Sequence, residues 1–237
     1  TKIKPLILPL EAAEDLSNLE ATKKSLAPHF ETYRSEYAAY YNQCKKENSP
    51  GMRDPNPVIL LYPGIGLFSF AKNKQTARVA SEFYLNAINV MRGAEAISSY
   101  TSLPLQEAFD IEYWLLEEAK LQRLPKEKPL SRKIALVTGA GGGIGMSIAK
   151  KLVAEGAVAV LLDISEDNLK EAAKYFAKDT AISVVCDIND QKAIEEAIQQ
   201  SCLHFGGIDI VVHSAGLAIS KPLSETTTQD WDLLQNI

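Results

Sequence analysis

The sequence predicts an α/β protein, a Rossmann-type doubly wound parallel sheet preceded by a smaller α+β domain. From Lys133 onward, short β-branched runs alternate with helical stretches, which is typical of parallel strands covered by helices on both faces. Just before that point, the two prolines of the run 125–129 interrupt helix and strand alike. A length of 237 residues also favours two units over one. We therefore expect one domain at residues 1–125, a linker at 126–132 and a second domain at 133–237.

The composition is that of an ordinary globular protein and excludes several functions. Apolar residues make up 46% of the chain, enough for a core, yet no apolar run approaches the ~20 residues of a membrane span. The 25 basic and 30 acidic side chains give a net charge of −5 without a dense basic patch, so neither nucleic acid nor a membrane is an expected partner. Three separated cysteines fit a reducing compartment, and we expect a cytoplasmic protein.

The first domain is predicted to contain helices around a short hairpin. Pro28 is expected to break the helix-permissive run 11–48, and Gly93 to end a helix that starts near residue 73. Apolar runs at 58–62 and 67–70 indicate two strands of a hairpin, and one further helix is expected after Pro104, with residues 105, 109, 113, 116 and 119 along one face. A stripe at steps of three or four follows Pro28 and consists of Phe30, Tyr33, Tyr37, Tyr41 and Cys44. Burial of this stripe is favoured, although a row of tyrosines could also stack against a ligand.

The second domain is predicted to hold four strands and three helices in alternation. The strands are expected at residues 134–138, 158–162, 182–186 and 208–212. The helices are expected at about 144–154, 167–176 and 190–205.

A glycine-rich loop joins the first of these strands to the first of these helices. It runs through Thr138, Gly139, Gly141, Gly142, Gly143, Ile144 and Gly145. A dinucleotide pyrophosphate needs a turn that tolerates positive φ, a backbone without a Cβ in the way, and free amides at a helix N-terminus. The glycines at 139, 143 and 145 can supply all three, so the succession of strand, loop and helix predicts a dinucleotide-binding site.

Asp163 ends the second strand, 18 residues past Gly145 (163 − 145). At that distance its carboxylate can accept hydrogen bonds from the hydroxyls of the adenosine ribose. The same charge would repel a 2′-phosphate, and Ile164, Ser165 and Glu166 follow in place of a basic residue, so NAD is favoured over NADP. In the alternative, Asp163 caps the next helix, a role for which Asp167 is better placed.

These residues resemble the short-chain dehydrogenase/reductase family, whose fingerprint Thr-Gly-x-x-x-Gly-x-Gly is matched at Thr138, Gly139, Gly143 and Gly145. The resemblance implies that Asp187 hydrogen-bonds the adenine amino group, that Ile188 packs on the ring, and that the run 213–216 lines the cofactor through its backbone. That run reads His-Ser-Ala-Gly where the family has Asn-Asn-Ala-Gly. The expected cofactor-binding residues are therefore Thr138, Gly139, Gly141, Gly142, Gly143, Ile144, Gly145, Asp163, Ile164, Asp187, Ile188, Ser214, Ala215 and Gly216.

The catalytic residues of that family are not expected within this chain. Asp230-Trp231-Asp232 resembles the start of a family helix whose catalytic asparagine comes seven residues after the tryptophan, just past Ile237. The family's serine and its Tyr-x-x-x-Lys pair would follow later still. We therefore expect a piece of a longer protein, with an incomplete sheet, weak binding of NAD and no turnover of its own.

Nearly the whole chain resembles the bifunctional rhamnulose-1-phosphate aldolase/lactaldehyde dehydrogenase family. The resemblance is carried by Asp54-Pro55-Asn56-Pro57 through Phe70, by Glu82-Phe83-Tyr84, by Asn86 to Glu95 and by Glu107 to Leu121. It implies a bacterial protein of rhamnose catabolism in which an N-terminal class II aldolase precedes this segment and the dehydrogenase oxidises L-lactaldehyde. Pro63 stands where such an aldolase has a zinc-binding histidine, so residues 1–125 resemble a degenerate aldolase-like or connecting segment without a metal. Members of these families commonly form homo-oligomers, which the resemblance also implies here.

Two other interpretations stay open at this point. The chain could act as a non-catalytic module that joins two enzyme domains and mediates oligomerisation. Alternatively, the parent protein could keep the fold without the activity, because the deciding positions lie beyond Ile237.

Overall fold

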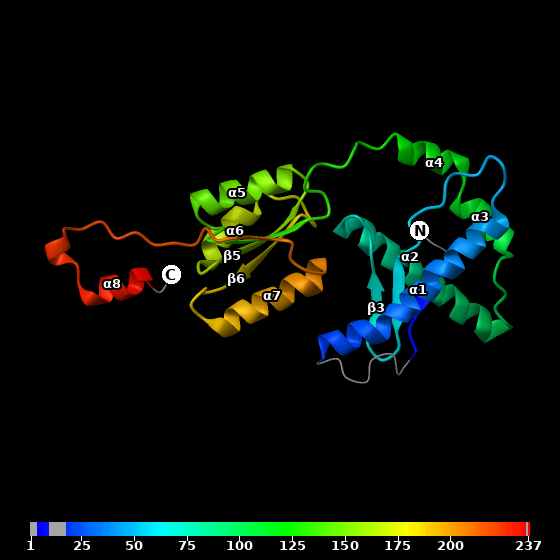
Figure 1. The fold of residues 1–237 in the computed structure, drawn as a ribbon, viewed down its shortest axis with the longest axis horizontal. Helices are drawn as coiled ribbons and strands as arrows, with labels where there is room; N and C mark the ends of the chain where they lie inside the picture. Colours follow the sequence, from blue (N-terminus) through cyan, green and yellow to red (C-terminus); the bar gives the residue numbers. More distant parts are fainter. Residues whose placement is uncertain (1–3, 10–17, 236) are drawn as a thin grey trace. The chain divides into compact units, whose positions relative to one another are not determined.

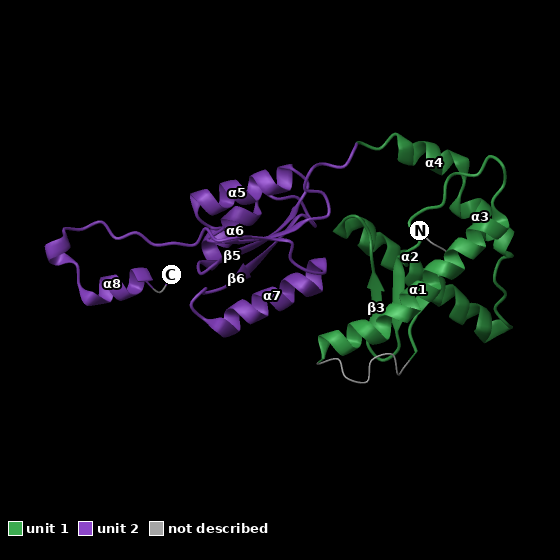
Figure 2. Ribbon diagram, viewed as in Figure 1, with its two compact units in different colours: residues 1–125 green, residues 126–237 purple. Residues whose placement is uncertain are grey.

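The computed structural model describes residues 4–9, 18–235 and 237. The chain divides into two compact units, unit 1 at Thr1–Pro125 and unit 2 at Lys126–Ile237 (Figure 2). Each unit has a sheet and a core of its own, and Figure 1 labels their helices and some of their strands.

Unit 1 contains a three-stranded sheet in the order β1-β2-β3. β2 (Ile59–Tyr62) and β3 (Gly66–Ser69) form the antiparallel hairpin that the two apolar runs predicted. β1 (Leu6–Ile7) pairs in parallel with β2 and was not predicted, because a two-residue strand is too short to show a period.

The described part of unit 1 has four helices, and three predictions about them were wrong. The helices are α1 (Leu19–Cys44), α2 (Lys74–Ile97), α3 (Leu105–Glu112) and α4 (Leu115–Gln122). α1 and α2 contact the sheet, and α3 packs on α1. α1 continues through Pro28 because the carbonyl that loses its partner belongs to Lys24, which is exposed and open to water. α2 continues past Gly93, since one glycine costs only about 1 kcal/mol in a helix. The predicted single helix after Pro104 is two helices, separated where Trp114 takes an extended conformation.

The predicted tyrosine stripe of α1 forms the core of unit 1. Tyr33, Tyr37 and Cys44 are buried, while Phe30 and Tyr41 pack against the same cluster. The sheet contributes Leu6 and Leu60, and α3 contributes Phe109, whose ring stacks on that of Tyr113 with the centroids 4.5 Å apart. The interruption between α3 and α4 comes at Trp114, directly after Tyr113, and the ring of Tyr113 stays in the core.

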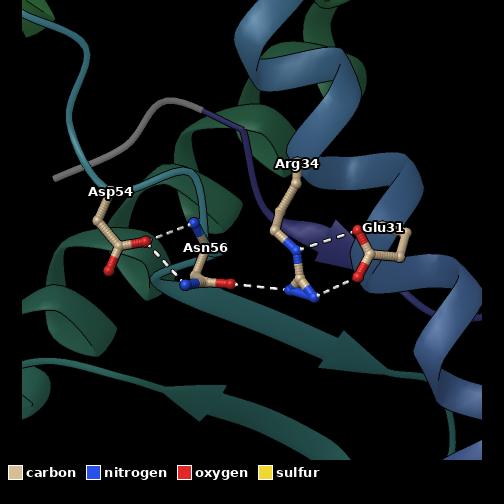
Figure 3. A network of polar contacts seen from close by, with 4 residues as sticks. All are labelled: Glu31, Arg34, Asp54 and Asn56. Carbon is tan, nitrogen blue, oxygen red and sulfur yellow. Dashed lines mark hydrogen bonds and ion pairs between the residues drawn. The ribbon is translucent and has the colours of Figure 1, made fainter.

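A polar network fixes the proline-rich connector that leads into β2 (Figure 3). Arg34 of α1 donates from Nη2 to Glu31 at 2.9 Å and from Nη1 to the Oδ1 of Asn56 at 3.0 Å. Asp54 Oδ1 in turn accepts both the backbone N–H and the side-chain amide of Asn56, each at 2.8 Å. Exposed contacts of this kind contribute little stability, so the network mainly sets the direction of the connector.

Unit 2 contains a four-stranded, fully parallel sheet in the order β6-β5-β4-β7. The strands are β4 (Ile134–Thr138), β5 (Val158–Asp163), β6 (Ala181–Val185) and β7 (Ile210–Val212). In chain order this is 3-2-1-4, the arrangement of the Rossmann-type sheet, and the predicted fold class is confirmed.

Helices cover both faces of this sheet, as Figure 1 shows. α5 (Gly143–Ala154) and α6 (Glu166–Ala173) pack on the face that carries Val137 and Leu161. α7 (Gln191–Phe205) packs on the opposite face, against Leu136 and Val160. These seven elements of the alternating pattern lie where the sequence predicted them, with ends displaced by a few residues. A short 3-10 turn, Leu223–Glu225, and α8 (Thr228–Gln235) follow.

Full burial of the central strands explains their uninterrupted apolar sequence. Ala159, Val160 and Leu161 have no exposed surface, and burying each large side chain stabilises the fold by about 1.5–3 kcal/mol. Because all four strands run in parallel, their carboxyl ends meet at one edge of the sheet. Among the helices described for either unit, none is both long and apolar enough to pass through a membrane.

Candidate functional site

The candidate site lies at the carboxyl edge of the parallel sheet of unit 2. The chain passes from β4 through α5 to β5 on one side and later returns to β7 on the other side of β4. Such a reversal of strand order leaves a crevice beyond the strand ends, which is the usual ligand-binding position in open α/β sheets. The residues that follow β4, β5, β6 and β7 line this edge.

Two glycines of the loop after β4 are required by the packing of the protein itself. Gly139 has a φ of +64°, and a Cβ on it would lie 2.8 Å from the Cα of Ala215. A Cβ on Gly145 would lie 2.3 Å from the carbonyl oxygen of Gly139. The absence of side chains therefore lets the loop fold tightly against both the segment after β7 and the start of α5.

Two glycines between them, Gly142 and Gly143, are exposed. A Cβ on Gly142 would lie 3.3 Å from the carbonyl oxygen of Gly139, whereas a Cβ on Gly143 would meet no atom within 4 Å and would face open space. Gly142 is the N-cap of α5 and offers no side chain to the amides of the first turn, which have no partner within the helix and carry partial positive charge. This open helix N-terminus fits an anion such as a pyrophosphate. Ile144, 76% exposed, stands beside it.

Asp163 points at the glycine loop from the end of β5. Its Oδ2 accepts the backbone N–H of Gly141 at 2.9 Å, and its Oδ1 accepts the N–H of Ser165 at 3.0 Å. The carboxylate therefore serves both the loop and the turn into α6. The N-cap of α6 is Ser165, whose Oγ accepts from Asn168, so the expectation that Asp167 fills this role was wrong.

Thr138 ties the loop to the segment after β7 through its hydroxyl group. The Oγ1 accepts the backbone N–H groups of Ser214 at 3.1 Å and Ala215 at 3.0 Å, and it donates to the carbonyl of Val212 at 3.4 Å. Ser214 and Ala215 are half-buried, whereas Gly216 is exposed. The sequence marked Thr138 as part of a fingerprint but gave no sign of this clamp.

Asp187 and Ile188 lie half-buried after β6, at the same edge of the sheet. Asp187 Oδ1 accepts the N–H of Asn189 at 2.9 Å, which closes the turn into α7. Burial raises the pKa of the neighbouring Cys186 thiol, and the charges of Asp187 and Asp190 raise it further, so this cysteine is not activated as a nucleophile.

One contributor to the site carried no signal in the sequence. The side chain of Asn168, on α6, backs the loop so closely that a Cβ on Gly141 would lie 2.6 Å from its own Cβ. Ile164, by contrast, is 68% exposed beside the loop.

Taken together, the groups at this edge are suited to binding a ligand. They include the backbone amides at the N-terminus of α5 and the carboxylates of Asp163 and Asp187, a set that can hold an anion next to a polyol. Within the described ranges, no three His, Cys, Asp or Glu side chains are grouped so that they could hold a metal ion.

Comparison with known families assigns the two parts of the chain to two different families. Residues 1–121 match the aldolase class II, second domain family, and residues 133–237 match the short chain dehydrogenase family. The chain therefore belongs to the class II aldolase second-domain family and carries a short-chain dehydrogenase domain behind that domain.

The chain is 36% identical over 211 residues to the Bacillus subtilis (strain 168) protein named uncharacterized oxidoreductase YuxG, a match that covers 87% of this chain and 30% of YuxG. It is 38% identical over 108 residues to the uncharacterized oxidoreductase SAR2567 of Staphylococcus aureus (strain MRSA252), covering 46% of this chain and 47% of that protein. A solved short chain dehydrogenase from Mycobacterium smegmatis is 34% identical, with a TM-score of 0.44, over 49% of this chain and 52% of that one. The chain thus spans less than one third of YuxG and about half of the other two proteins.

Proposed function

We propose that unit 2 binds NAD at the carboxyl edge of its sheet and forms the cofactor-binding part of a dehydrogenase that acts on a small aldehyde or alcohol. The observation that carries this proposal is the 2.9 Å hydrogen bond from the N–H of Gly141 to Asp163, beside the open N-terminus of α5. An anion site and a carboxylate held next to it match the pyrophosphate and the adjoining ribose of an adenosine diphosphate group.

Each residue set has a defined role in this proposal. The amides at Gly143, Ile144 and Gly145 would hold the pyrophosphate, and Asp163 would accept hydrogen bonds from the ribose hydroxyls. Asp187 and Ile188 would flank the adenine, and the segment 214–216, held by Thr138, would line the cofactor further along the edge. NAD, when bound, supplies the acceptor for a hydride.

The charge around Asp163 supports NAD over NADP. A 2′-phosphate would meet the carboxylate of Asp163, and Ile164 follows it without a basic side chain. The first basic residue beyond is Lys170, whose Nζ already pairs with Glu166 at 2.9 Å. A compensating cation for the extra phosphate is therefore absent from this stretch of the chain.

The pairing of domains supports the finer assignment to L-lactaldehyde. A class II aldolase that cleaves rhamnulose 1-phosphate releases an aldehyde, and a dehydrogenase on the same chain could oxidise that product. The aldolase class II and short-chain dehydrogenase domains stand side by side in the sequence. We therefore propose that the whole protein joins rhamnulose-1-phosphate cleavage to the NAD-dependent oxidation of L-lactaldehyde.

Calorimetric titration of this chain with NAD and with NADP tests the cofactor assignment. We expect NAD to bind and NADP to bind at least about tenfold more weakly, since one lost charged hydrogen bond costs about 1.5–3 kcal/mol. Asp163→Asn should reduce this preference, whereas Asp167→Asn, which removes the same charge from α6, should not. Equal affinity for both cofactors, or binding of neither, would refute the proposal.

A further inference from the structure

Unit 1 contains a cavity of about 320 Å³ between α1 and α3. This volume lies at the small end of the range for ligand sites in proteins. Besides aliphatic residues of both helices, its lining includes Lys4, Tyr33, Glu36, Tyr37, Tyr40 and Glu112. Its walls are therefore mainly aromatic and aliphatic, with one acidic side chain from α3 among them.

That acidic side chain, Glu112, is 94% buried, since only 6% of its surface is exposed. A buried carboxylate is costly unless hydrogen bonds or a cation compensate it. Two tyrosines of α1 donate to it, Tyr37 to Oε1 at 2.6 Å and Tyr40 to Oε2 at 3.4 Å. Among the described residues, no Lys, Arg or His forms an ion pair with Glu112.

The hydrogen-bond chain behind Glu112 has a fixed direction. The Tyr37 hydroxyl gives its single proton to Glu112, so at its 2.6 Å contact with the Tyr113 hydroxyl it must accept. Tyr113 therefore donates to Tyr37 and accepts the backbone N–H of Arg53 at 3.3 Å. Every donor in this series of hydrogen bonds points toward Glu112, whose carboxylate is the final acceptor.

An ionised carboxylate can accept about four hydrogen bonds, and the two tyrosines use two of them. The remaining acceptor capacity belongs to a side chain that lines the cavity. The other charged groups at the cavity are Lys4 and Glu36, which pair with each other and cancel. The lining thus carries one uncompensated negative charge among aromatic rings.

We propose that this cavity binds a small organic ammonium ion, with its N–H groups on Glu112 and its hydrocarbon part against the rings of Tyr33, Tyr37 and Tyr40. Aromatic walls around a carboxylate favour such a cation because ring faces attract positive charge and accept apolar surface. A neutral alcohol of the same shape lacks the charge, and a carboxylic acid anion would be repelled. The site belongs to the aldolase-like unit and is independent of the cofactor assignment for unit 2.

Calorimetric titration of the full chain with n-butylammonium, n-butanol and butyrate tests this site. We expect n-butylammonium to bind at least about tenfold more tightly than n-butanol, because only the ammonium ion donates a charge-assisted hydrogen bond to Glu112, and we expect butyrate not to bind. Glu112→Gln keeps the shape of the side chain and removes its charge, so it should lower n-butylammonium affinity at least tenfold. Equal affinities for the three probes, or no binding of n-butylammonium, would overturn the proposal.

A second pair of variants keeps the test decisive if Glu112→Gln fails to fold. Ala39→Trp places bulk at the exposed rim of the cavity without touching Glu112, and it should abolish n-butylammonium binding. Asn42→Trp adds the same bulk at an exposed position of α1 that does not line the cavity, and it should leave binding unchanged. If both tryptophan variants bind like the unaltered chain, the cation does not occupy this cavity.

Discussion

Glycine is needed in the loop of unit 2 for two different reasons, and a matched pair of substitutions distinguishes them. Gly145 leaves room for the packing of the loop itself, whereas Gly143 leaves room for a ligand. In Gly145→Ala, the new methyl group would lie 2.3 Å from the carbonyl oxygen of Gly139, closer than any relaxed contact. Overpacking of this kind costs about 1–3 kcal/mol, which outweighs the roughly 1 kcal/mol that alanine gains over glycine in a helix. In Gly143→Ala, the methyl group meets nothing within 4 Å, so only the gain remains. Gly145→Ala should therefore destabilise unit 2, whereas Gly143→Ala should leave it as stable or slightly more stable.

Urea unfolding followed by circular dichroism measures the two free-energy changes, and peptide-resolved hydrogen exchange assigns them to unit 2. NAD titration of the same variants tests whether Gly143 leaves room for the cofactor. Gly143→Ala should weaken NAD binding about tenfold or more although it is fully folded, because its methyl group occupies the space in front of the α5 amides. If Gly143→Ala binds NAD normally, or if Gly145→Ala is as stable as the unaltered chain, the assignment of the two glycines is refuted.

Three further outcomes follow from individual contacts. Hydrogen bonding from the N–H of Ile134, with help from the adjacent lysine, lowers the pKa of Asp209. This carboxylate therefore stabilises the fold above its unfolded pKa of about 4. Urea titrations should show that Asp209→Ala lowers the free energy of unfolding at pH 7 and that this loss shrinks as pH falls. Thr138→Val keeps the side-chain volume but leaves two backbone N–H groups without their acceptor, and thermal unfolding should show a loss of about 1–3 kcal/mol. Burial, and after it the charge of Glu112, raises the pKa of Tyr33 to about 12, and burial also raises the pKa of Tyr37. Ultraviolet titration at about pH 11 should therefore find both hydroxyls still protonated. The free energy of unfolding should fall as pH rises above the unfolded tyrosine pKa of about 10.

Hydrophobic patterning predicted unit 2 better than unit 1 for a physical reason. A parallel strand buried on both faces, such as β5, must be apolar at nearly every position, and its run therefore stands out from the amphipathic helices around it. Unit 1 is held together by a tyrosine core between helices, whose ends depend on tertiary contacts. Pro28 and Gly93 are local signals worth a few kcal/mol at most, and packing overrode both.

At the site, the sequence could indicate which residue types gather at the sheet edge but not how they share their bonds. The glycine spacing and Asp163 were visible because phosphate and ribose chemistry demand them at those distances from the strand ends. The clamp from Thr138 to the segment after β7 and the support from Asn168 link positions far apart in the chain. No local pattern carries such information, since the partners meet only when β4, β5 and β7 lie in one sheet.

The bond between Asp163 and Gly141 has a consequence for how a cofactor would bind. Two backbone N–H groups of the protein hold the carboxylate next to the loop. One belongs to Gly141 in the loop, and the other belongs to Ser165, just after β5. A carboxylate fixed in this way loses little conformational entropy when it accepts a ribose hydroxyl, so more of each new hydrogen bond would appear as affinity. The same two bonds also stabilise the turn into α6, which means that any substitution of Asp163 changes the loop as well as the ligand contacts. Cofactor preference measured on Asp163 variants therefore has to be separated from loop stability, and Asp163→Asn, which preserves one acceptor oxygen, is the substitution that does so with least disturbance.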